Sequence, residues 1–197
     1  MTATQSFLQT KGVSDRVHPL SVEAYHALGE IGRVDENVEL LRGIVVDKMS
    51  KSPLHSAIVR RLFQLLFSFI GEESDLILLK EDPLTLSDSE PEPDLAIVNA
   101  AEADNFHHHP TTAHLVVEVA VSSVEIDRLK ASIYAEAGIP EFWLVRPAES
   151  EIDVFSQPKD GNYHQQRTLR SEDSLTCAVF PKFSIKAGEL LRQSAEN

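Results

Sequence analysis

Two acidic residues of this chain lie where chemistry is expected. Glu118 stands in the middle of an apolar run, residues 115–121, whose length and β-branched residues are typical of a buried strand. Burial of an unpaired carboxylate is costly, so Glu118 requires a cationic partner, a metal ion or a shifted pKa. Asp94 follows Pro93 at the entrance of a second apolar stretch, residues 94–98. Neighbouring strands lie about 4.8 Å apart, so the two carboxylates are predicted to converge on one divalent cation.

Such a cation would suit the hydrolysis of a phosphate ester. Mg²⁺ prefers oxygen ligands and keeps several waters, so it can activate a water and neutralise charge on a phosphate. The helix predicted after the Glu118 strand carries Asp127, Lys130 and Tyr134 on one face, because they are spaced i, i+3 and i+7. We expect Lys130 to orient the attacking water, and Asp127 and Tyr134 to orient Lys130 or to hold the helix against the sheet.

Each of these residues also has a structural interpretation. An aspartate that follows a proline, such as Asp94, is by itself more typical of a turn. Glu118 could form a structural ion pair with Lys130 or Arg128. Lysines on helices are more often solvated than catalytic. A histidine near a helix start, such as His55, more often caps or packs than ligates, so we place His55 only near the site.

The elements that must position these residues can be predicted from local patterns. Ser52 and Pro53 begin the strongest predicted helix, which runs to about residue 70 with Gly71 as its stop. A hairpin is predicted over residues 37–47, turning near Arg42 and Gly43. The other predicted elements are a helix over residues 22–29 capped by Ser21, strands over residues 75–81 and 141–145, a C-terminal meander over residues 152–155, 163–169 and 175–180, and one closing turn in a polar tail that starts at Ala187.

Composition predicts one globular domain. The chain has 197 residues, of which 42% are hydrophobic and 25% charged. Residues 1–17 are polar and aperiodic, and we expect a loose arm. The single Cys177 excludes an intramolecular disulfide and fits a reducing compartment. There is neither an apolar run of about 20 residues nor a signal-peptide pattern at the N-terminus, so a cytoplasmic protein without membrane contact is expected.

The charge balance argues against a broad nucleic-acid-binding face. The chain has 31 acidic and 18 basic residues, a net charge of −13, and no basic run longer than Arg60-Arg61. Proteins that grip duplex phosphates usually present a basic face. Any contact with nucleic acid is therefore expected to be local, metal-dependent or shared with another subunit.

Several segments together resemble a known family. They are residues 39–43 (ELLRG), His55, residues 91–94 (PEPD), residues 117–119 (VEV) and residues 135–145 (AEAGIPEFWLV). In type and order they resemble the Uma-type family, a bacterial, restriction-endonuclease-like group of the PD-(D/E)XK nuclease superfamily. The last segment is the most specific, and the likeness runs from about Ser21 to Leu190.

The resemblance implies a restriction-endonuclease-like α/β fold, with a mixed central sheet flanked by helices and a C-terminal β meander. It implies an endonuclease that hydrolyses DNA phosphodiester bonds with Mg²⁺ or Mn²⁺. Asp94 and Glu118 match the metal-binding acids. Glu39 matches an additional upstream glutamate, with a structural role about equally expected. A homodimer is expected by analogy with nucleases that address both strands.

One position departs from the superfamily pattern. The superfamily lysine stands two residues after the second acid, where this chain has Ala120. The superfamily tolerates a lysine relocated to the neighbouring helix, which makes Lys130 the candidate.

Two other functions remain open. Ala120 and the acidic surface favour a catalytically weakened or inactive protein that serves as an interaction or assembly module. A zinc protein could use residues 107–109, three consecutive histidines. Adjacent residues of an extended loop point in different directions, so an exposed loop is expected there instead.

Overall fold

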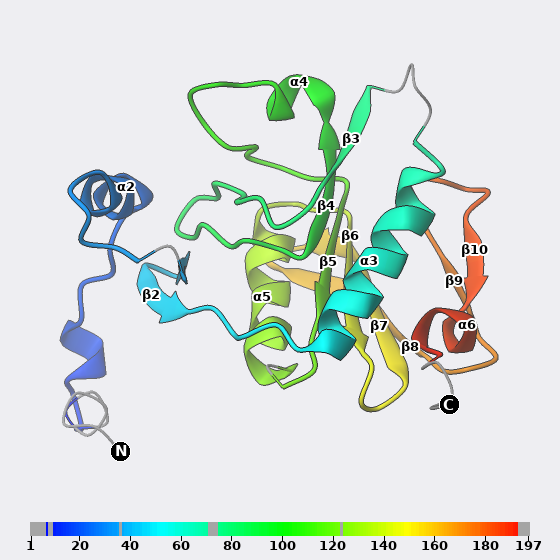
Figure 1. Ribbon diagram of the computed structural model, residues 1–197. Coiled ribbons are helices and arrows are strands. Elements are labelled where there is room, and N and C mark those ends of the chain that lie inside the picture. The colour runs from blue at the N-terminus through cyan, green and yellow to red at the C-terminus, as the bar shows by residue number, and fades with distance from the viewer. Residues whose placement is uncertain (1–6, 8–9, 36, 71–74, 123, 193–197) are drawn as a thin grey trace.

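The computed structural model describes residues 7, 10–35, 37–70, 75–122 and 124–192 (Figure 1). Its centre is a six-stranded sheet in the order β3-β4-β5-β6-β7-β8. The sheet strands are β3 (Leu76–Leu79), β4 (Leu95–Asn99), β5 (Leu115–Val119), β6 (Glu141–Arg146), β7 (Glu151–Lys159) and β8 (Asn162–Leu169). The other elements are η1 (Ser14–Arg16), α2 (Val22–Glu30), β1 (Val38–Leu41), β2 (Ile44–Asp47), α3 (Pro53–Phe67), α4 (Ala100–Ala103), α5 (Val124–Glu136), β9 (Ser174–Thr176), β10 (Ser184–Lys186) and α6 (Ala187–Leu191).

The predicted α/β class with a mixed sheet is confirmed. Strands β5 and β6 pair in parallel, and every other neighbouring pair in this sheet is antiparallel. A parallel pair needs a crossover connection, and α5 provides it. After α5 the chain turns at Gly138, whose φ of +74° lies in the left-handed region that favours glycine.

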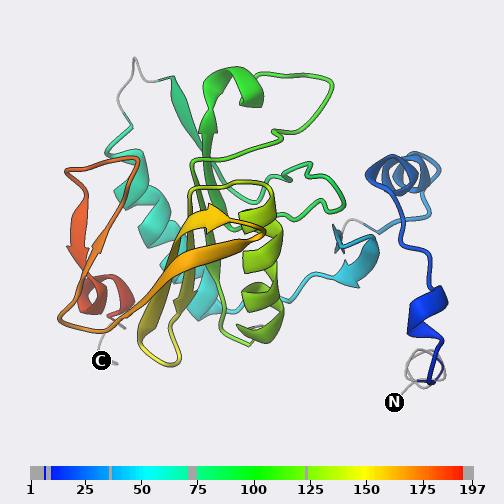
Figure 2. The ribbon, with the colours of Figure 1, turned by 180° about the vertical axis from the view of Figure 1, so that it is seen from behind.

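Helices cover both faces of the sheet and so create two cores. Helix α3 packs on one face together with α6, and α5 packs on the opposite face (Figures 1 and 2). Along β5 and the residue that follows it, Val117 and Val119 belong to the α3 core, whereas Val116 and Ala120 belong to the α5 core. Side chains alternate along a strand. Glu118 therefore faces α5.

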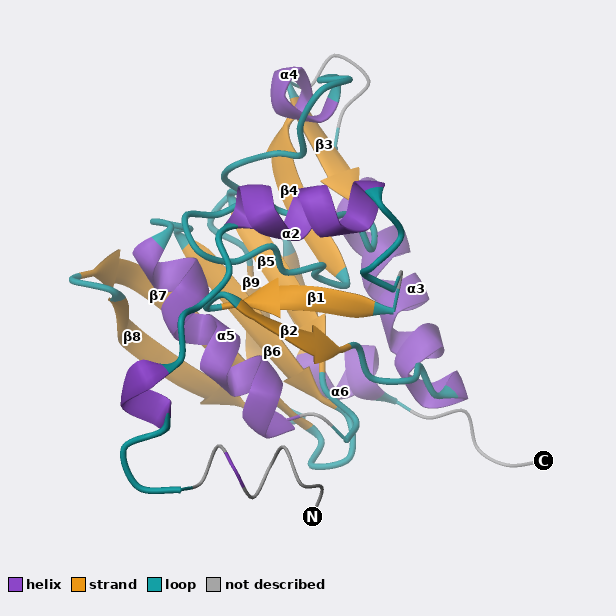
Figure 3. Cartoon of the chain, turned by 90° about the vertical axis from the view of Figure 1, so that its left-hand side faces the viewer, coloured by secondary structure: helices purple, strands orange, loops and turns teal. Residues whose placement is uncertain are grey.

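The predicted N-terminal elements are confirmed. The side chain of Ser21 caps α2 by accepting from the Ala24 amide at 3.2 Å. Strands β1 and β2 form the predicted hairpin, and its turn residues Arg42 and Gly43 have φ of 53° and 72°. A Cβ on Gly43 would lie 2.3 Å from Pro19, so the close approach of this segment requires glycine. Figure 3 shows the hairpin in front of the sheet, beside α2.

Several predicted boundaries differ from the structure. Helix α3 ends at Phe67, because the amides of Phe69 and Ile70 bond to the carbonyls of Leu66 and Phe67, three residues back, instead of continuing the helical pattern. The predicted stop at Gly71 lies outside the described residues, as does most of the predicted arm before residue 10. Strands β7 and β8 extend the central sheet, but β9 leaves it and pairs with β10. The expected closing turn is α6, whose Leu190 and Leu191 are buried on the α3 side.

A buried acid at the start of β6 ties this strand to the C-terminal segment. Glu141 accepts from the Trp143 indole at 2.5 Å and from the Ala178 amide at 2.9 Å. Glu141→Ala leaves two donors without their acceptor, so we expect the free energy of unfolding to fall by about 1–3 kcal/mol. Urea denaturation followed by Trp143 fluorescence measures this loss, and Glu149→Ala at an exposed position is the control. Equal stability of both variants would contradict this role.

Within the part of the chain that the structure describes, no helix combines the length and hydropathy needed to cross a membrane.

Candidate active site

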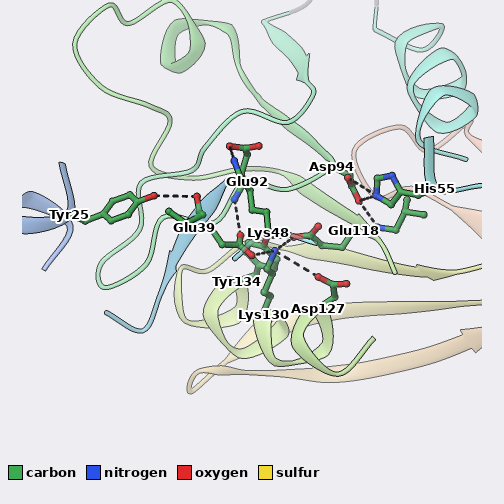
Figure 4. A network of polar contacts seen from close by, with 12 residues as sticks. Tyr25, Glu39, Lys48, His55, Glu92, Asp94, Glu118, Asp127, Lys130 and Tyr134 are labelled. Atoms are coloured by element: carbon green, nitrogen blue, oxygen red, sulfur yellow. Dashed lines mark hydrogen bonds and ion pairs between the residues drawn. The ribbon is translucent and has the colours of Figure 1, made fainter. Parts of the chain in front are cut away.

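The residues predicted to act together line one open cavity of about 80 Å³, called the catalytic cavity below. Glu39 comes from β1, Asp94 from the residue before β4, Glu118 from β5 and Lys130 from α5 (Figure 4). The register of the sheet explains part of this arrangement. Strands β4 and β5 are antiparallel, and Leu95 is paired with Val117. Asp94 therefore lies beside Glu118, at the same end of this strand pair.

Lys130 is the centre of a buried ion-pair cluster. Its Nζ lies 2.9 Å from Glu39 Oε1, 3.0 Å from Glu118 Oε1 and 3.8 Å from Asp127 Oδ1. The side chain of Lys130 is only 5% exposed. The Tyr134 hydroxyl donates to Glu118 Oε1 at 2.8 Å. The lysine and the carboxylates therefore pair with one another, because none of these charged groups has free access to water.

The electrostatics of the cluster reflect this burial. Burial raises the pKa of Glu118, and the charges of Asp127, Asp94 and Glu39 add to it against the opposing effect of Lys130. Burial disfavours the charge on Lys130, but the carboxylates outweigh it and raise its pKa. The lysine is therefore held as an ammonium.

The other suggested partner of Glu118, Arg128, makes a different contact. Its guanidinium lies 3.3 Å from Asp153 on β7. The alternative of a Glu118–Arg128 ion pair is therefore wrong, whereas the Lys130 pair is present.

Asp94 is held by a backbone amide and a histidine. Its Oδ2 accepts from the Val119 amide at 2.8 Å, and His55 Nε2 lies 3.0 Å from the carboxylate. The His55 amide in turn donates to Ser52 Oγ, the N-cap of α3. His55 Nδ1 is buried and makes no hydrogen bond among the described residues. His55 therefore contacts Asp94 directly. The sequence had placed His55 only near the site.

Sequence reasoning missed a second pair at the same cavity. Lys48, which follows β2, lies 2.8 Å from Glu92, and both line the cavity. The Glu92 amide donates to Glu39 Oε2 at 3.2 Å. Glu92 belongs to the PEPD segment, which was the one available signal. No sequence pattern indicated Lys48, because it follows the hairpin as a single polar residue outside any motif.

The donor chemistry of the cavity suits a hard divalent cation. Carboxylate oxygens of Asp94, Glu118 and Glu39 are the ligands that Mg²⁺ and Mn²⁺ prefer. The arrangement seen is nevertheless an ion-pair cluster, since the Lys130 ammonium lies between two of the three acids. Among the described residues, no three histidine, cysteine or acidic side chains are grouped so that they could hold a metal ion. A metal ion bound at the Oε1 atoms of Glu39 and Glu118 would compete there with the Lys130 ammonium.

The histidines at residues 107–109 are exposed, as predicted. His108 contacts Asn105 at 2.7 Å and the His109 carbonyl at 3.1 Å, so its ring is engaged within the loop. Nothing in the described residues groups these histidines into a metal site.

The hairpin that carries Glu39 is anchored to α5 by Arg42. The guanidinium contacts Glu136 at 2.5 and 2.6 Å and Asp88 at 3.1 Å. Arg42→Ala removes these contacts, and we expect amide hydrogen exchange of residues 38–47 to become about tenfold faster. Exchange mass spectrometry measures this rate, with the exposed Arg33 changed to alanine as control. An unchanged rate would show that the hairpin is held by other contacts.

Comparison with family models identifies this arrangement with a known group of proteins. The Uma2 model, described as "Putative restriction endonuclease", matches residues 22–188. The chain belongs to the Uma2 family. The match spans every segment that carried the resemblance, including the residues that line the catalytic cavity. A restriction-endonuclease-like nuclease family is thus the coarse assignment of this protein.

A solved structure supports the fold. A crystal structure described as a "putative nuclease belonging to DUF820 from Anabaena variabilis ATCC 29413" superposes with a TM-score of 0.73. The match covers 88% of this Uma2 chain and 98% of that chain, at 15% sequence identity. At this identity the likeness establishes the fold alone. No curated protein sequence matches the chain.

Proposed function

We propose that this Uma2 protein is a divalent-metal-dependent endonuclease that hydrolyses phosphodiester bonds in DNA. The observation that carries the proposal is the meeting of Glu39, Asp94, Glu118 and Lys130 at one open cavity, from segments far apart in the chain. Burying three acids and a lysine together costs desolvation free energy. Such a cluster is therefore more typical of a catalytic or binding site than of a stabilising core.

Each residue of the cavity has its own role in the proposed reaction. Asp94 and Glu118, assisted by Glu39, would hold Mg²⁺ or Mn²⁺. Bound there, such an ion would supply charge neutralisation at the phosphate and a bound water of lowered pKa. Lys130 Nζ, which keeps a further N–H group beside its contacts with Glu39 and Glu118, would donate to the attacking water and orient it. Tyr134 keeps Glu118 in place through the hydrogen bond at Oε1.

The missing lysine at position 120 is compatible with this division. Ala120 is fully buried in the α5 core, on the face of the sheet that Glu118 also uses. A lysine from α5 approaches that same face and reaches Glu118 Oε1 at 3.0 Å. Lys130 therefore supplies from the helix the ammonium that the strand lacks.

The test is a nuclease assay on single-stranded, linear and supercoiled DNA with Mg²⁺ or Mn²⁺. We expect cleavage that EDTA stops and that Asp94→Ala and Glu118→Ala abolish. Cleavage that survives both substitutions would overturn the site.

We also propose a cytoplasmic homodimer, since duplex cleavage requires access to both strands. Sedimentation velocity of the purified protein tests the dimer, and a monomer at working concentration would contradict it.

A second function has one specific observation in its favour. The ammonium of Lys130 pairs with two of the three acids, Glu39 at 2.9 Å and Glu118 at 3.0 Å. A protein of this kind could keep the nuclease fold as an interaction or assembly module. Calorimetric titration with Mg²⁺ and Mn²⁺ separates the two functions, because a module of this kind shows no binding heat and the nuclease does.

A further inference from the structure

A second cavity opens beside the catalytic cavity, on the side of α3. It has a volume of about 270 Å³ and is called the α3 cavity below. Its lining residues are Ser56, Val59, Arg60, Phe63, Lys80 and Glu81. Ser56, Arg60 and Phe63 are spaced i, i+4 and i+7 and so share one face of α3. The cavity combines apolar residues, including an aromatic ring, with two cationic residues.

The two cavities adjoin. Lys51 lines the catalytic cavity and pairs at 2.9 Å with Glu81, which lines the α3 cavity. The Glu81 amide donates to the Asp94 carbonyl at 3.3 Å. His55 and Arg60 are five residues apart on α3, about 7.5 Å along the helix axis. The α3 cavity therefore lies within reach of a strand whose phosphate enters the catalytic cavity.

The segment around α3 is basic, although the chain as a whole is acidic. The net charge of the protein is −13, yet residues 48–70 contain four basic residues and no acid. Within this segment, the Arg61 guanidinium is bound to the carbonyls of Leu190 and Arg192. Arg60, in contrast, is exposed and makes no ion pair among the described residues. Arg60 is therefore available to a ligand.

Glu81 does not make the α3 cavity acidic. It pairs with Lys51 and, at 3.2 Å, with Lys80. With these two lysines and Arg60, the group keeps a net positive charge of two. The floor of the cavity is apolar, since Val59 is buried and the Phe63 ring stacks on Phe67 with centroids 5.8 Å apart. Cationic side chains beside an aromatic face are the usual components of a site for an unpaired nucleotide.

We infer that the α3 cavity is a subsite for an unpaired nucleotide of the nucleic-acid strand whose phosphate enters the catalytic cavity. Arg60 and Lys80 bind the phosphate of this nucleotide, and its base lies against Phe63 and Val59. The inference rests on the proposed function, because it extends the path of the same strand. It predicts that single-stranded segments bind better than blunt duplex.

The test is fluorescence anisotropy with a labelled single-stranded oligonucleotide and a blunt duplex of the same sequence, with Ca²⁺ in place of Mg²⁺. Arg60→Ala/Lys80→Ala is compared with Lys159→Ala/Arg167→Ala, which removes the same charge from exposed positions on β7 and β8. We expect the first pair to weaken single-strand binding about tenfold and to reduce the salt slope by about 0.7, the value for one phosphate of a single strand. The control pair should change affinity less than about twofold.

Phe63→Leu tests the aromatic contact while it keeps an apolar side chain in place. We expect it to weaken binding of the single strand about fivefold and to leave the blunt duplex nearly unchanged. Should Phe63→Leu prove unstable by circular dichroism, the exposed Arg60 and Lys80 still decide the matter.

Each result separates this subsite from the proposed function. Equal losses in the two double variants, or equal losses for single strand and duplex, would overturn the subsite. Cleavage by the wild type, together with normal binding by Arg60→Ala/Lys80→Ala, would overturn the subsite and leave the nuclease standing. A wild type that neither binds nor cleaves any DNA would overturn both.

Discussion

Replacing Lys130 with methionine is expected to lower the free energy of unfolding by about 3–5 kcal/mol at neutral pH and to abolish cleavage. Methionine keeps the length and apolar stem of the side chain but removes the ammonium. Glu39, Glu118 and Asp127 would then face one another without a counter-charge in a buried site. The cost comes from desolvated like charges rather than from lost packing.

Low pH and divalent cations should both rescue this variant. A carboxyl whose pKa is raised in the folded state, as for Glu118, binds its proton more tightly folded than unfolded. Its contribution to stability is therefore greatest below the unfolded-state pKa and falls as pH rises through the folded-state pKa. Lys130→Met should regain stability as pH falls. Mg²⁺ should stabilise it more than it stabilises the wild type, because the cation replaces the ammonium.

Urea denaturation followed by Trp143 fluorescence measures both effects. Lys159→Met, at an exposed position, is the matched control and should unfold like the wild type. A Lys130→Met protein as stable as this control would show that the three acids do not depend on the ammonium of Lys130 in the folded state. Loss of stability without rescue by Mg²⁺ would argue against a metal site formed by these carboxylates.

Neutralising the two proposed metal ligands is expected to slow cleavage at least about 10³-fold, a loss of about 4 kcal/mol in transition-state stabilisation. Glu118→Gln and Asp94→Asn keep the shape of each side chain. The amide oxygen can still accept from Lys130 and Tyr134 at position 118, or from the Val119 amide at position 94. Stability should therefore change by no more than about 1–2 kcal/mol in either variant.

Single-turnover cleavage rates at saturating Mg²⁺ measure the chemical step. Asp160→Asn in the turn between β7 and β8 is the control, because asparagine tolerates the positive φ of 53° at that position. Rates within about tenfold of the wild type in both ligand variants would refute the roles of Asp94 and Glu118. The contrast with Lys130→Met also matters: Lys130 is expected to affect both stability and cleavage, whereas the two acids are expected to affect cleavage far more than stability.

Local sequence patterns were sufficient for most elements of the fold. Capping by Ser21 and Ser52, the turn at Arg42 and Gly43, and the apolar run around Glu118 depend on interactions within a few residues. One difference lay where a distant segment decides the outcome. Strand β9 pairs with β10 rather than with β8, and this choice depends on how the C-terminal segment packs against α3. The other difference, the end of α3, depends on a local change to bonds between residues three apart, which hydrophobic periodicity does not report.

For the site, the sequence by itself determined which residue types were candidates. A glutamate inside an apolar strand, an aspartate at a strand entrance and a lysine on the next helix were recognisable from type and spacing. Only the tertiary structure decided how they meet. Both faces of β5 are buried, so the run around Glu118 carries no alternation that would show which face the carboxylate uses. The register of β4 on β5 and the packing of α5 place Lys130 between Glu118 and Glu39, and the N-terminus of α3 places His55 against Asp94. Distances of about 3 Å between residues separated by dozens of positions arise from packing and strand register, which spacing along the chain does not encode.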